Sequence, residues 1–225
     1  MSDAHASKET ATSGFQLLSI LLQYPEAELL QEREALQALI PRNWQGALAP
    51  LFTHLGETAL IDLQQQYVMT FDRNPSHSLH LFEHIHGESR DRGQAMVDLM
   101  AEYSRHGLQM VGDDLPDYVP LFLEFLSLQD EAEAERLLGD AIHVLAYIGR
   151  KLRANGSPYA CVFELLQTLT NVVAEELSEP PVRDMDEALE TFGPGADGIE
   201  PLLKPRMDGT HPVNFYPKAA APQRH

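Results

Sequence analysis

Apolar residues recur along this chain at the spacing that places them on one face of an α-helix. They lie three and four residues apart in the runs Leu17–Leu22, Met96–Tyr103, Leu138–Leu152 and Val162–Val173. Alternation of apolar and polar residues between hairpin turns, the pattern typical of strands, is hard to find. The sequence therefore predicts an all-α fold, and it shows no repeat of fixed length.

Capping residues and prolines mark where these helices begin and end. Residues 13–16 read SGFQ, the form of a capping box at the start of the first helix. Tyr24-Pro25 ends that helix, because the residue before a proline disfavours the α conformation. Ser89 or Asp91 is the expected N-cap of a later helix, and Asn155-Gly156 ends the long one. Further helices are predicted for the run Leu29, Leu30, Leu36 and Leu39 before Pro41, for 44–55 and 60–71, and after Ser157-Pro158.

The character of the chain changes after residue 178, where prolines and glycines become frequent. We expect one helical domain at 13–178, a disordered N-terminus at 1–12, and an acidic, Pro/Gly-rich, largely flexible and extended C-terminal tail at 179–225. Within the tail, a helical remnant is expected around Asp184–Phe192. The run HPVNFYP at 211–217 is either a docking motif or part of a solvated end.

Composition and charge narrow the choice of partners. The 225 residues carry a formal net charge of −18, which repels nucleic acid and anionic lipid and attracts a peptide rich in Arg and Lys. Solubility alone is another explanation for this acidity. The sequence contains neither a run long enough for a membrane span nor the features of a secretory signal. A single cysteine, Cys161, excludes an internal disulfide. We expect a cytoplasmic protein without an integral membrane segment.

A group of histidines suggests metal chemistry at first sight. On a helix, His80 and His84 would face the same way and could hold a metal. The metalloprotease signature is absent, because the glutamate precedes the second histidine instead of following the first. Hydrogen bonding and packing are the commoner roles of such histidines, so we predict no metal site. The rival hypothesis is a metal-dependent enzyme that uses His80, His84 and His86 with Glu83 or Glu88.

Nucleophilic catalysis finds no support in the sequence. Cys161 shares a helical face with Leu165 and Leu169, which is typical of a small buried side chain. The chain contains neither a G-x-S-x-G motif nor a P-loop. We therefore do not expect an enzyme.

The most distinctive sequence motifs lie in the middle of the chain. Residues 82–96 read FEHIHGESRDRGQAM and residues 115–126 read LPDYVPLFLEFL. Both runs resemble the NarJ branch of the molybdoenzyme-specific chaperone family, whose other members serve trimethylamine oxide and dimethyl sulfoxide reductases. LLQYP at 21–25 and GPGADG at 193–198 extend the likeness over most of the chain. The sequence departs from the family at His80, where an aromatic residue is common, and in the far C-terminus.

This resemblance implies a single-domain helical bundle with a groove for the N-terminal, leader-like peptide of the apo catalytic α subunit of nitrate reductase, alone or in its α–β complex. It implies a protein that binds no cofactor stably. Such a protein assists insertion of bis-molybdopterin guanine dinucleotide and iron–sulfur clusters before membrane anchoring. Proteins that make the molybdenum cofactor are further candidate partners. The alternative is a chaperone that targets another molybdoenzyme to the twin-arginine translocase.

The resemblance also suggests where the client peptide binds. A basic amphipathic helix requires an apolar groove with acidic rims. Asp117 and Tyr118 are expected to form an exposed acid–aromatic pair at the start of a helix. Arg90 and Arg92 are expected to be secondary client contacts, or else partners of nearby acids. The expected peptide-binding residues, of which the aromatic ones at 67, 71 and 122 have core packing as an alternative role, are Tyr67, Phe71, Asp117, Tyr118, Phe122 and Glu124.

Overall fold

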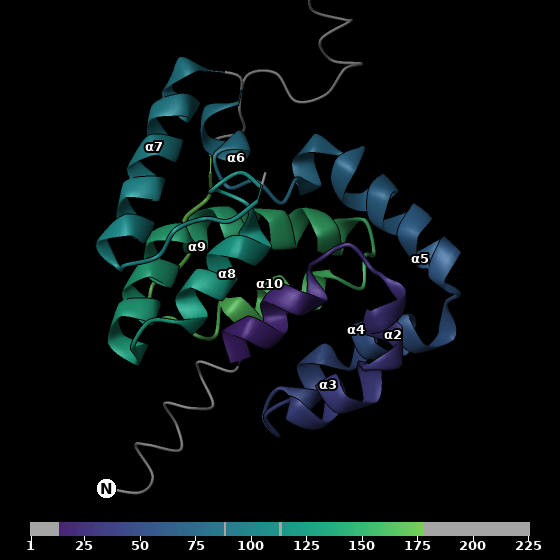
Figure 1. Ribbon diagram of the computed structural model, residues 1–225. Helices are drawn as coiled ribbons and strands as arrows, with labels where there is room; N and C mark the ends of the chain where they lie inside the picture. The colour runs from purple at the N-terminus through teal and green to yellow at the C-terminus, as the bar shows by residue number, and fades with distance from the viewer. Residues whose placement is uncertain (1–13, 88, 113, 178–225) are drawn as a thin grey trace, which may run out of the picture. The chain divides into compact units, whose positions relative to one another are not determined.

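The structure, a computed structural model, describes residues 14–87, 89–112 and 114–177 (Figure 1). These residues form helices and one isolated antiparallel bridge, and no strand occurs among them. The predicted all-α class is therefore confirmed for the described part of the chain. Residues 14–21 are helical, and the later helices are α2 (Ala27–Gln31), α3 (Arg33–Leu39), α4 (Gln45–Glu57), α5 (Leu60–Tyr67), α6 (Glu83–His86), α7 (Arg90–Arg105), α8 (Val119–Ser127), α9 (Glu131–Ala154) and α10 (Ala160–Leu166).

Helix α9 is the longest described element, and its ends follow local rules. The Asp130 carboxylate accepts a 3.0 Å hydrogen bond from the backbone N–H of Glu133, which satisfies one of the first free donors of the helix. Gly156 follows Asn155 in the left-handed region, at φ 69°. The predicted end at Asn155-Gly156 is thus confirmed. Gly149 lets α10 approach closely, because a Cβ there would lie 2.7 Å from the Cβ of Phe163.

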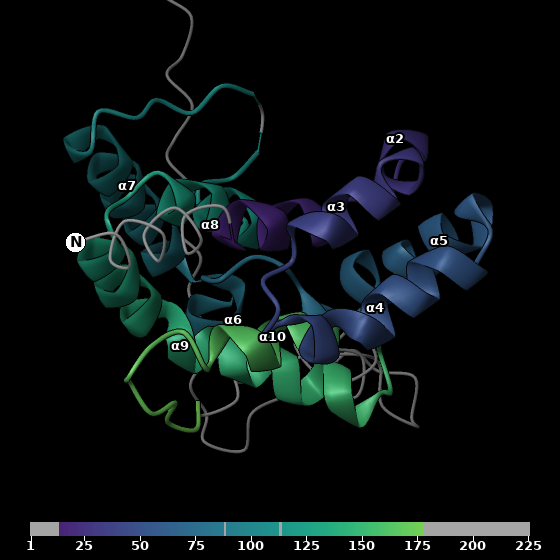
Figure 2. The ribbon, with the colours of Figure 1, turned by 90° about the horizontal axis from the view of Figure 1, so that it is seen from below.

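Two groups of helices lie on opposite sides of α9 and α10 (Figures 1 and 2). Helices α2 to α5 are on one side, and α7 is on the opposite side, beyond α8. Ser89 caps α7 by accepting a 3.2 Å bond from the N–H of Asp91, as one of the two expected caps. Tyr103 is the fully buried residue of α7. This helix therefore depends on few contacts with the core.

Two apolar runs differ from the expected helices. The run before Pro41 forms two short helices, α2 and α3, and Leu39 at the end of α3 is 68% exposed. The run after Ser157-Pro158 leaves the helix at Leu166, where the Thr168 hydroxyl donates a 2.7 Å bond to the carbonyl of Leu165. Val173, expected on the same helical face, is 84% exposed. The chain instead follows α9, and the Asn171 side-chain amide donates a 2.6 Å bond to Glu135.

Several predictions lie outside the described residues. These are Ser13 of the capping box, the terminal segments 1–12 and 179–225, the expected helix at Asp184–Phe192 and the run at 211–217. Their boundaries remain predictions. None of the described helices combines the length and apolar character that crossing a membrane requires.

Candidate functional site

Tyr67 and Phe71 form the aromatic floor of the site. Helix α5 continues after Tyr67 into a π-helical turn, η1 (Val68–Asp72), in which the N–H of Arg73 bonds the carbonyl of Val68. Such wide turns change the direction of side chains and are frequent at functional sites. The ring centroids of Tyr67 and Phe71 lie 4.8 Å apart, and Phe71 meets the ring of Tyr159 edge-on at 5.0 Å.

The hydroxyl group of Tyr67 ties this floor to the first helical segment. It donates a 2.9 Å hydrogen bond to the carbonyl of Leu22 and lies 3.4 Å from the hydroxyl of Tyr118. The ring of Tyr24 stands edge-on against Tyr67, with centroids 5.5 Å apart. Burial, reinforced by Tyr118, raises the pKa of Tyr67 far above its ordinary value, so the phenol is neutral.

A short backbone bridge joins the loop after η2 (Pro75–His77) to the start of α8. The N–H of Leu81 donates to the carbonyl of Asp117 at 3.0 Å, and the N–H of Val119 donates to the carbonyl of Leu79 at 2.7 Å. His80 and Tyr118 therefore lie opposite each other, with ring centroids 5.5 Å apart. This bridge joins the residues directly before the 82–96 run to the 115–126 run.

The Asp117 side chain is fully buried and stabilises this bridge through hydrogen bonds. Its carboxylate accepts hydrogen bonds from His80 Nδ1 at 3.2 Å and from the N–H of Phe82 at 3.1 Å. The Arg92 guanidinium lies 3.8 Å away. Burial by itself raises the pKa of Asp117. The bonds and charges of His80, Phe82 and Arg92 outweigh that effect and lower the pKa below its usual range. The expectation of an exposed Asp117 is wrong, because this carboxylate satisfies buried donors.

A cavity of about 470 Å³ opens beside this bridge. Asp72 and Glu83 contribute carboxylates to its wall, and the Ser78 hydroxyl donates a hydrogen bond to Glu83. Neither lysine nor arginine is among its lining residues, so the cavity is electronegative as well as partly aromatic. The lining consists of Tyr24, Tyr67, Phe71, Asp72, Pro75, Ser78, Leu79, His80, Glu83 and Tyr118.

The residues expected to bind peptide are only partly brought together here. Tyr67, Phe71 and Tyr118 line the cavity, and Asp117 reaches it through His80. Phe122 is buried on α8, and Glu124 is exposed; neither lines the cavity. The residues that sequence reasoning did not place in the site are Tyr24, Asp72, Pro75, Ser78, Leu79, His80 and Glu83. The LLQYP run at 21–25 was the available signal for Tyr24.

The two arginines proposed as secondary contacts differ in their surroundings. Ser89 caps the helix that Arg90 begins, and Arg90 itself is exposed. Arg92 is half-buried and pairs with Asp117. Pairing with an acidic neighbour and helix capping, the roles considered beside client contact, thus both occur in this segment.

The histidines of this region contact different partners instead of one centre. His80 lies before α6, so it shares no helix with His84. His84 is buried, and its Nε2 donates a 2.8 Å bond to the carbonyl of Ser78. His77 Nδ1 donates to the carbonyl of Thr70 at 3.0 Å, and its Nε2 accepts from Asn155 at 2.7 Å. Within the described ranges, each of these three histidines therefore has hydrogen-bonding partners of its own.

Cys161 is buried as predicted. Burial raises the pKa of its thiol to about 11, which leaves little thiolate at neutral pH. The thiol instead lies 3.1 Å from the carbonyl of Pro158. Its surroundings are those of a small core residue.

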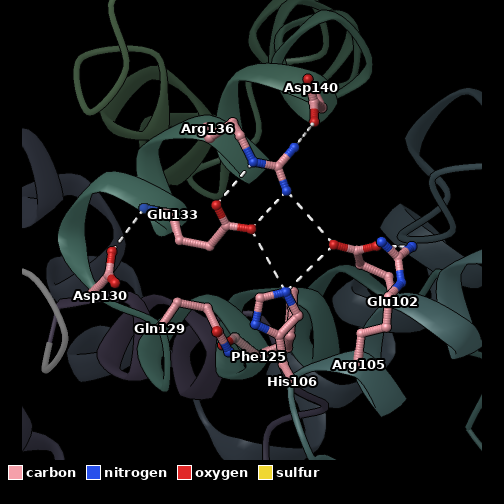
Figure 3. A network of polar contacts seen from close by, with 9 residues as sticks. All are labelled: Glu102, Arg105, His106, Phe125, Gln129, Asp130, Glu133, Arg136 and Asp140. Carbon is pink, nitrogen blue, oxygen red and sulfur yellow. Dashed lines mark hydrogen bonds and ion pairs between the residues drawn. The ribbon is translucent and has the colours of Figure 1, made fainter.

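A second polar network joins α7 to α9 (Figure 3). His106 Nε2 lies 3.4 Å from Glu102 and 3.6 Å from Glu133. In the described part of the chain, these three residues are the group whose ligand atoms converge closely enough for a metal ion. Arg136 already contacts both carboxylates, at 3.6 and 2.7 Å, so a guanidinium supplies the positive charge between them.

Comparison with solved structures defines the class of this fold. The chain resembles a redox enzyme maturation protein from Archaeoglobus fulgidus with a TM-score of 0.54 and 22% sequence identity, over 70% of this chain and 91% of the other. The described helices therefore have the fold of a redox enzyme maturation protein.

Sequence comparison defines the family more narrowly. The model of the nitrate reductase delta subunit family matches residues 37–164. The nitrate reductase molybdenum cofactor assembly chaperone NarJ of Escherichia coli K12 is 41% identical over 186 residues, which cover 77% of this chain and 79% of the relative. The probable assembly chaperone NarW of the same strain is 42% identical over 158 residues, 68% of this chain and 66% of the relative. The chain belongs to the nitrate reductase delta subunit family.

Proposed function

We propose that this protein is a non-catalytic, cytoplasmic chaperone for the catalytic subunit of a nitrate reductase. The family assignment supports this proposal, together with relatives described as chaperones of molybdenum cofactor assembly. The client is the apo catalytic subunit, alone or with its β subunit. Holding that subunit open assists insertion of the molybdenum cofactor and iron–sulfur clusters before the enzyme reaches its membrane anchor.

The cavity beside Tyr118 is the proposed binding site for the N-terminal segment of the client. The observation that carries this assignment is a cavity lined by two buried aromatic rings, those of Tyr67 and Phe71, and by the two carboxylates of Asp72 and Glu83. A basic amphipathic segment places an apolar side chain against such rings and its cations against the carboxylates. Asp117 acts as a positioning residue, because it holds His80 and Tyr118 across the backbone bridge.

The same charge pattern argues against stable binding of the cofactor itself. A pyrophosphate is best held by clustered arginines, which form charge-assisted and bidentate hydrogen bonds. Arg92 pairs with Asp117, and Arg105 pairs with Glu102 on the far end of α7. We therefore propose that the cofactor is inserted into the client without a resident site in this chain.

Release of the client requires that the mature enzyme bind less well than the apo enzyme, since only a differential affinity shifts such an equilibrium. Pull-down from cells that cannot make the cofactor should then recover more complex than pull-down from cofactor-replete cells. Equal recovery from both kinds of cell would contradict this release step.

Calorimetric titration with a synthetic peptide that copies the N-terminus of the nitrate reductase catalytic subunit tests the proposed site. We expect saturable 1:1 binding. Tyr24→Ala removes a half-exposed aromatic wall of the cavity and should weaken binding about tenfold or more. Met69→Ala is the matched control, because Met69 is 66% exposed on η1 and does not line the cavity.

Three outcomes separate the parts of this proposal. Loss of affinity in Tyr24→Ala, with Met69→Ala unchanged, supports both the function and the site. Tight binding that neither substitution weakens would support the chaperone role but contradict the proposed position of the site. Absence of binding at low salt and at several pH values would contradict the proposal that this protein binds the N-terminal peptide of the client.

A further inference from the structure

A second cavity lies next to the proposed peptide site. Its volume is about 380 Å³, and Tyr24 lines both cavities. The remaining lining comes from the first helical segment and from α2 and α3. The residues around it are Ile20, Gln23, Tyr24, Glu26, Glu28, Leu29, Glu32 and Leu36. The surface next to the proposed site is therefore continuous across one aromatic side chain.

Tyr24 lies between the two cavities, and two contacts stabilise its position. The side-chain amide of Gln64 on α5 donates a 3.0 Å hydrogen bond to the carbonyl of Pro25, which fixes the turn that carries Tyr24. The edge-on contact with Tyr67 fixes the ring itself. Because Tyr24 lines both cavities and remains 43% exposed, a bound segment that spans the two cavities would contact it.

The second cavity combines an apolar base with a strongly acidic rim. Leu36 is buried at its base, and Ile20 and Leu29 are half-buried beside it. Glu26, Glu28 and Glu32 are exposed around this base. Among the residues that the structure describes, none forms an ion pair with any of these three carboxylates. By contrast, Glu102 and Glu133 on the other side of the bundle are each paired with arginine. Within this part of the chain, the three glutamates thus present carboxylates that are not held in an ion pair.

We propose that this second cavity is the cation-selecting half of the client-binding surface. The inference rests on the proposed function and extends it. An apolar anchor of the client segment lies in the first cavity, and the segment crosses Tyr24. Its next apolar side chain then packs on Leu29 and Leu36, while flanking Lys or Arg side chains pair with Glu28 and Glu32. The client recognised in this way is a basic amphipathic peptide with cations beyond its aromatic or apolar anchor.

Charge complementarity selects this occupant over two others. A second copy of this chain would bring another net charge of −18 to an acidic rim, which opposes association. A phosphate-bearing ligand would meet the three glutamates without an arginine or lysine among the lining residues. A cationic peptide binds favourably here, since the glutamates attract its charge and the apolar base of the cavity buries its apolar face.

A pair of charge-matched double variants tests the proposal in the full-length protein. Glu28→Gln/Glu32→Gln removes two charges from the rim of the second cavity. Glu34→Gln/Glu57→Gln removes two charges from exposed positions on α3 and α4 that line neither cavity. We expect the first variant to weaken binding of the N-terminal client peptide about fivefold, because each lost ion pair is exposed. The control should change the affinity by less than twofold, and high salt should remove the difference.

A second peptide, in which Gln replaces the cationic residues beyond the anchor, completes a double-mutant cycle between the protein and the peptide. Glu28→Gln/Glu32→Gln should bind this peptide as well as the unchanged protein does. An equal loss in the control variant, or an undiminished loss with the neutral peptide, would overturn the assignment of the second cavity. Strong binding of the original peptide, unaffected by the rim variant, refutes this inference alone. Absence of binding to the unchanged protein would refute the proposed function as well.

Discussion

Two places in this fold join a carboxylate, a histidine and an arginine, and they differ in access to water. Asp117, His80 and Arg92 meet behind the cavity, where the Asp117 side chain has no exposed surface. Glu133, His106 and Arg136 meet between α7 and α9, where the Glu133 and Arg136 side chains are 28% and 51% exposed (Figure 3).

The difference in burial decides what each network does. Removing one member of a buried pair leaves its partners desolvated and unsatisfied, which is costly. Exposed pairs can exchange their partner for water and contribute little. The buried network therefore determines the position of the bridge and of Tyr118, whereas the surface network assists the docking of α7. The following predictions order these effects by expected size.

Asp117→Ala should produce the largest loss of stability. The substitution leaves His80 and the N–H of Phe82 without their acceptor and Arg92 without its ion-pair partner, so we expect the free energy of unfolding to fall by about 3–5 kcal/mol. Urea denaturation at neutral pH, followed by circular dichroism, measures this change. Asp114→Ala removes an exposed carboxylate from the same loop and should change stability by less than about 0.5 kcal/mol. Similar losses in both variants would show that Asp117 is not the centre of the bridge.

Acid should destabilise the region of the buried network in two stages. Burial lowers the pKa values of His77 and His84 in the folded protein, so below about pH 6.5 the unfolded chain binds more protons and stability falls. The pKa of Asp117 is also lowered, so its contribution is present above about pH 4 and is lost as the pH falls further.

Unfolding midpoints in urea between pH 8 and pH 3 test these stages. Each group should contribute at most about 1.4 kcal/mol per pH unit where it titrates. His84→Gln should reduce the slope between pH 7 and 5, and the same substitution at the less enclosed His54, whose pKa burial also lowers, should reduce it less. A stability that rises steadily from pH 7 to 5 would contradict the assignment of neutral buried histidines.

Tyr67→Phe should have an intermediate effect. It keeps the ring contacts and removes the 2.9 Å bond to the carbonyl of Leu22, which costs about 1–2 kcal/mol for a buried acceptor left unpaired. Tyr118→Phe removes only the longer 3.4 Å contact between the two hydroxyl groups and should cost less. Thermal unfolding of the two single variants and the double variant separates these terms. A larger loss in Tyr118→Phe would reverse the assigned order.

Local signals made several elements predictable from the sequence. The end of α9 at Asn155-Gly156 and the Ser89 cap of α7 were predictable because capping depends on neighbouring residues alone. The run before Pro41 differs from the prediction, since Leu36 is the buried residue of α3, Ile40 is buried just after the helix, and Leu39 faces water. The helix after Ser157-Pro158 is shorter than predicted, because apolar spacing continues past the point where the Thr168 hydroxyl bonds the backbone and the helix ends.

The site depends more on contacts between distant residues. Tyr67 and Phe71 could be predicted as neighbours, because they lie four positions apart in a run predicted as one helix. The burial of Asp117 could not, since it depends on His80, which lies 37 positions earlier in the chain and approaches through a backbone bridge. Tyr24 enters the site through its contact with Tyr67, which the spacing within either segment does not reveal.

Arg136→Gln should have the smallest effect and should sharpen the contrast with Asp117. Arg136 binds Glu133 through two bonds of 2.9 and 2.7 Å and also contacts Asp140, but the guanidinium is half-exposed. Water and His106 can replace it, so the urea midpoint should shift no more than in Asp114→Ala. High salt should abolish any difference, because screening acts on exposed charges. A loss as large as that of Asp117→Ala, persisting in high salt, would mean that the surface network supports the bundle as strongly as the buried one does.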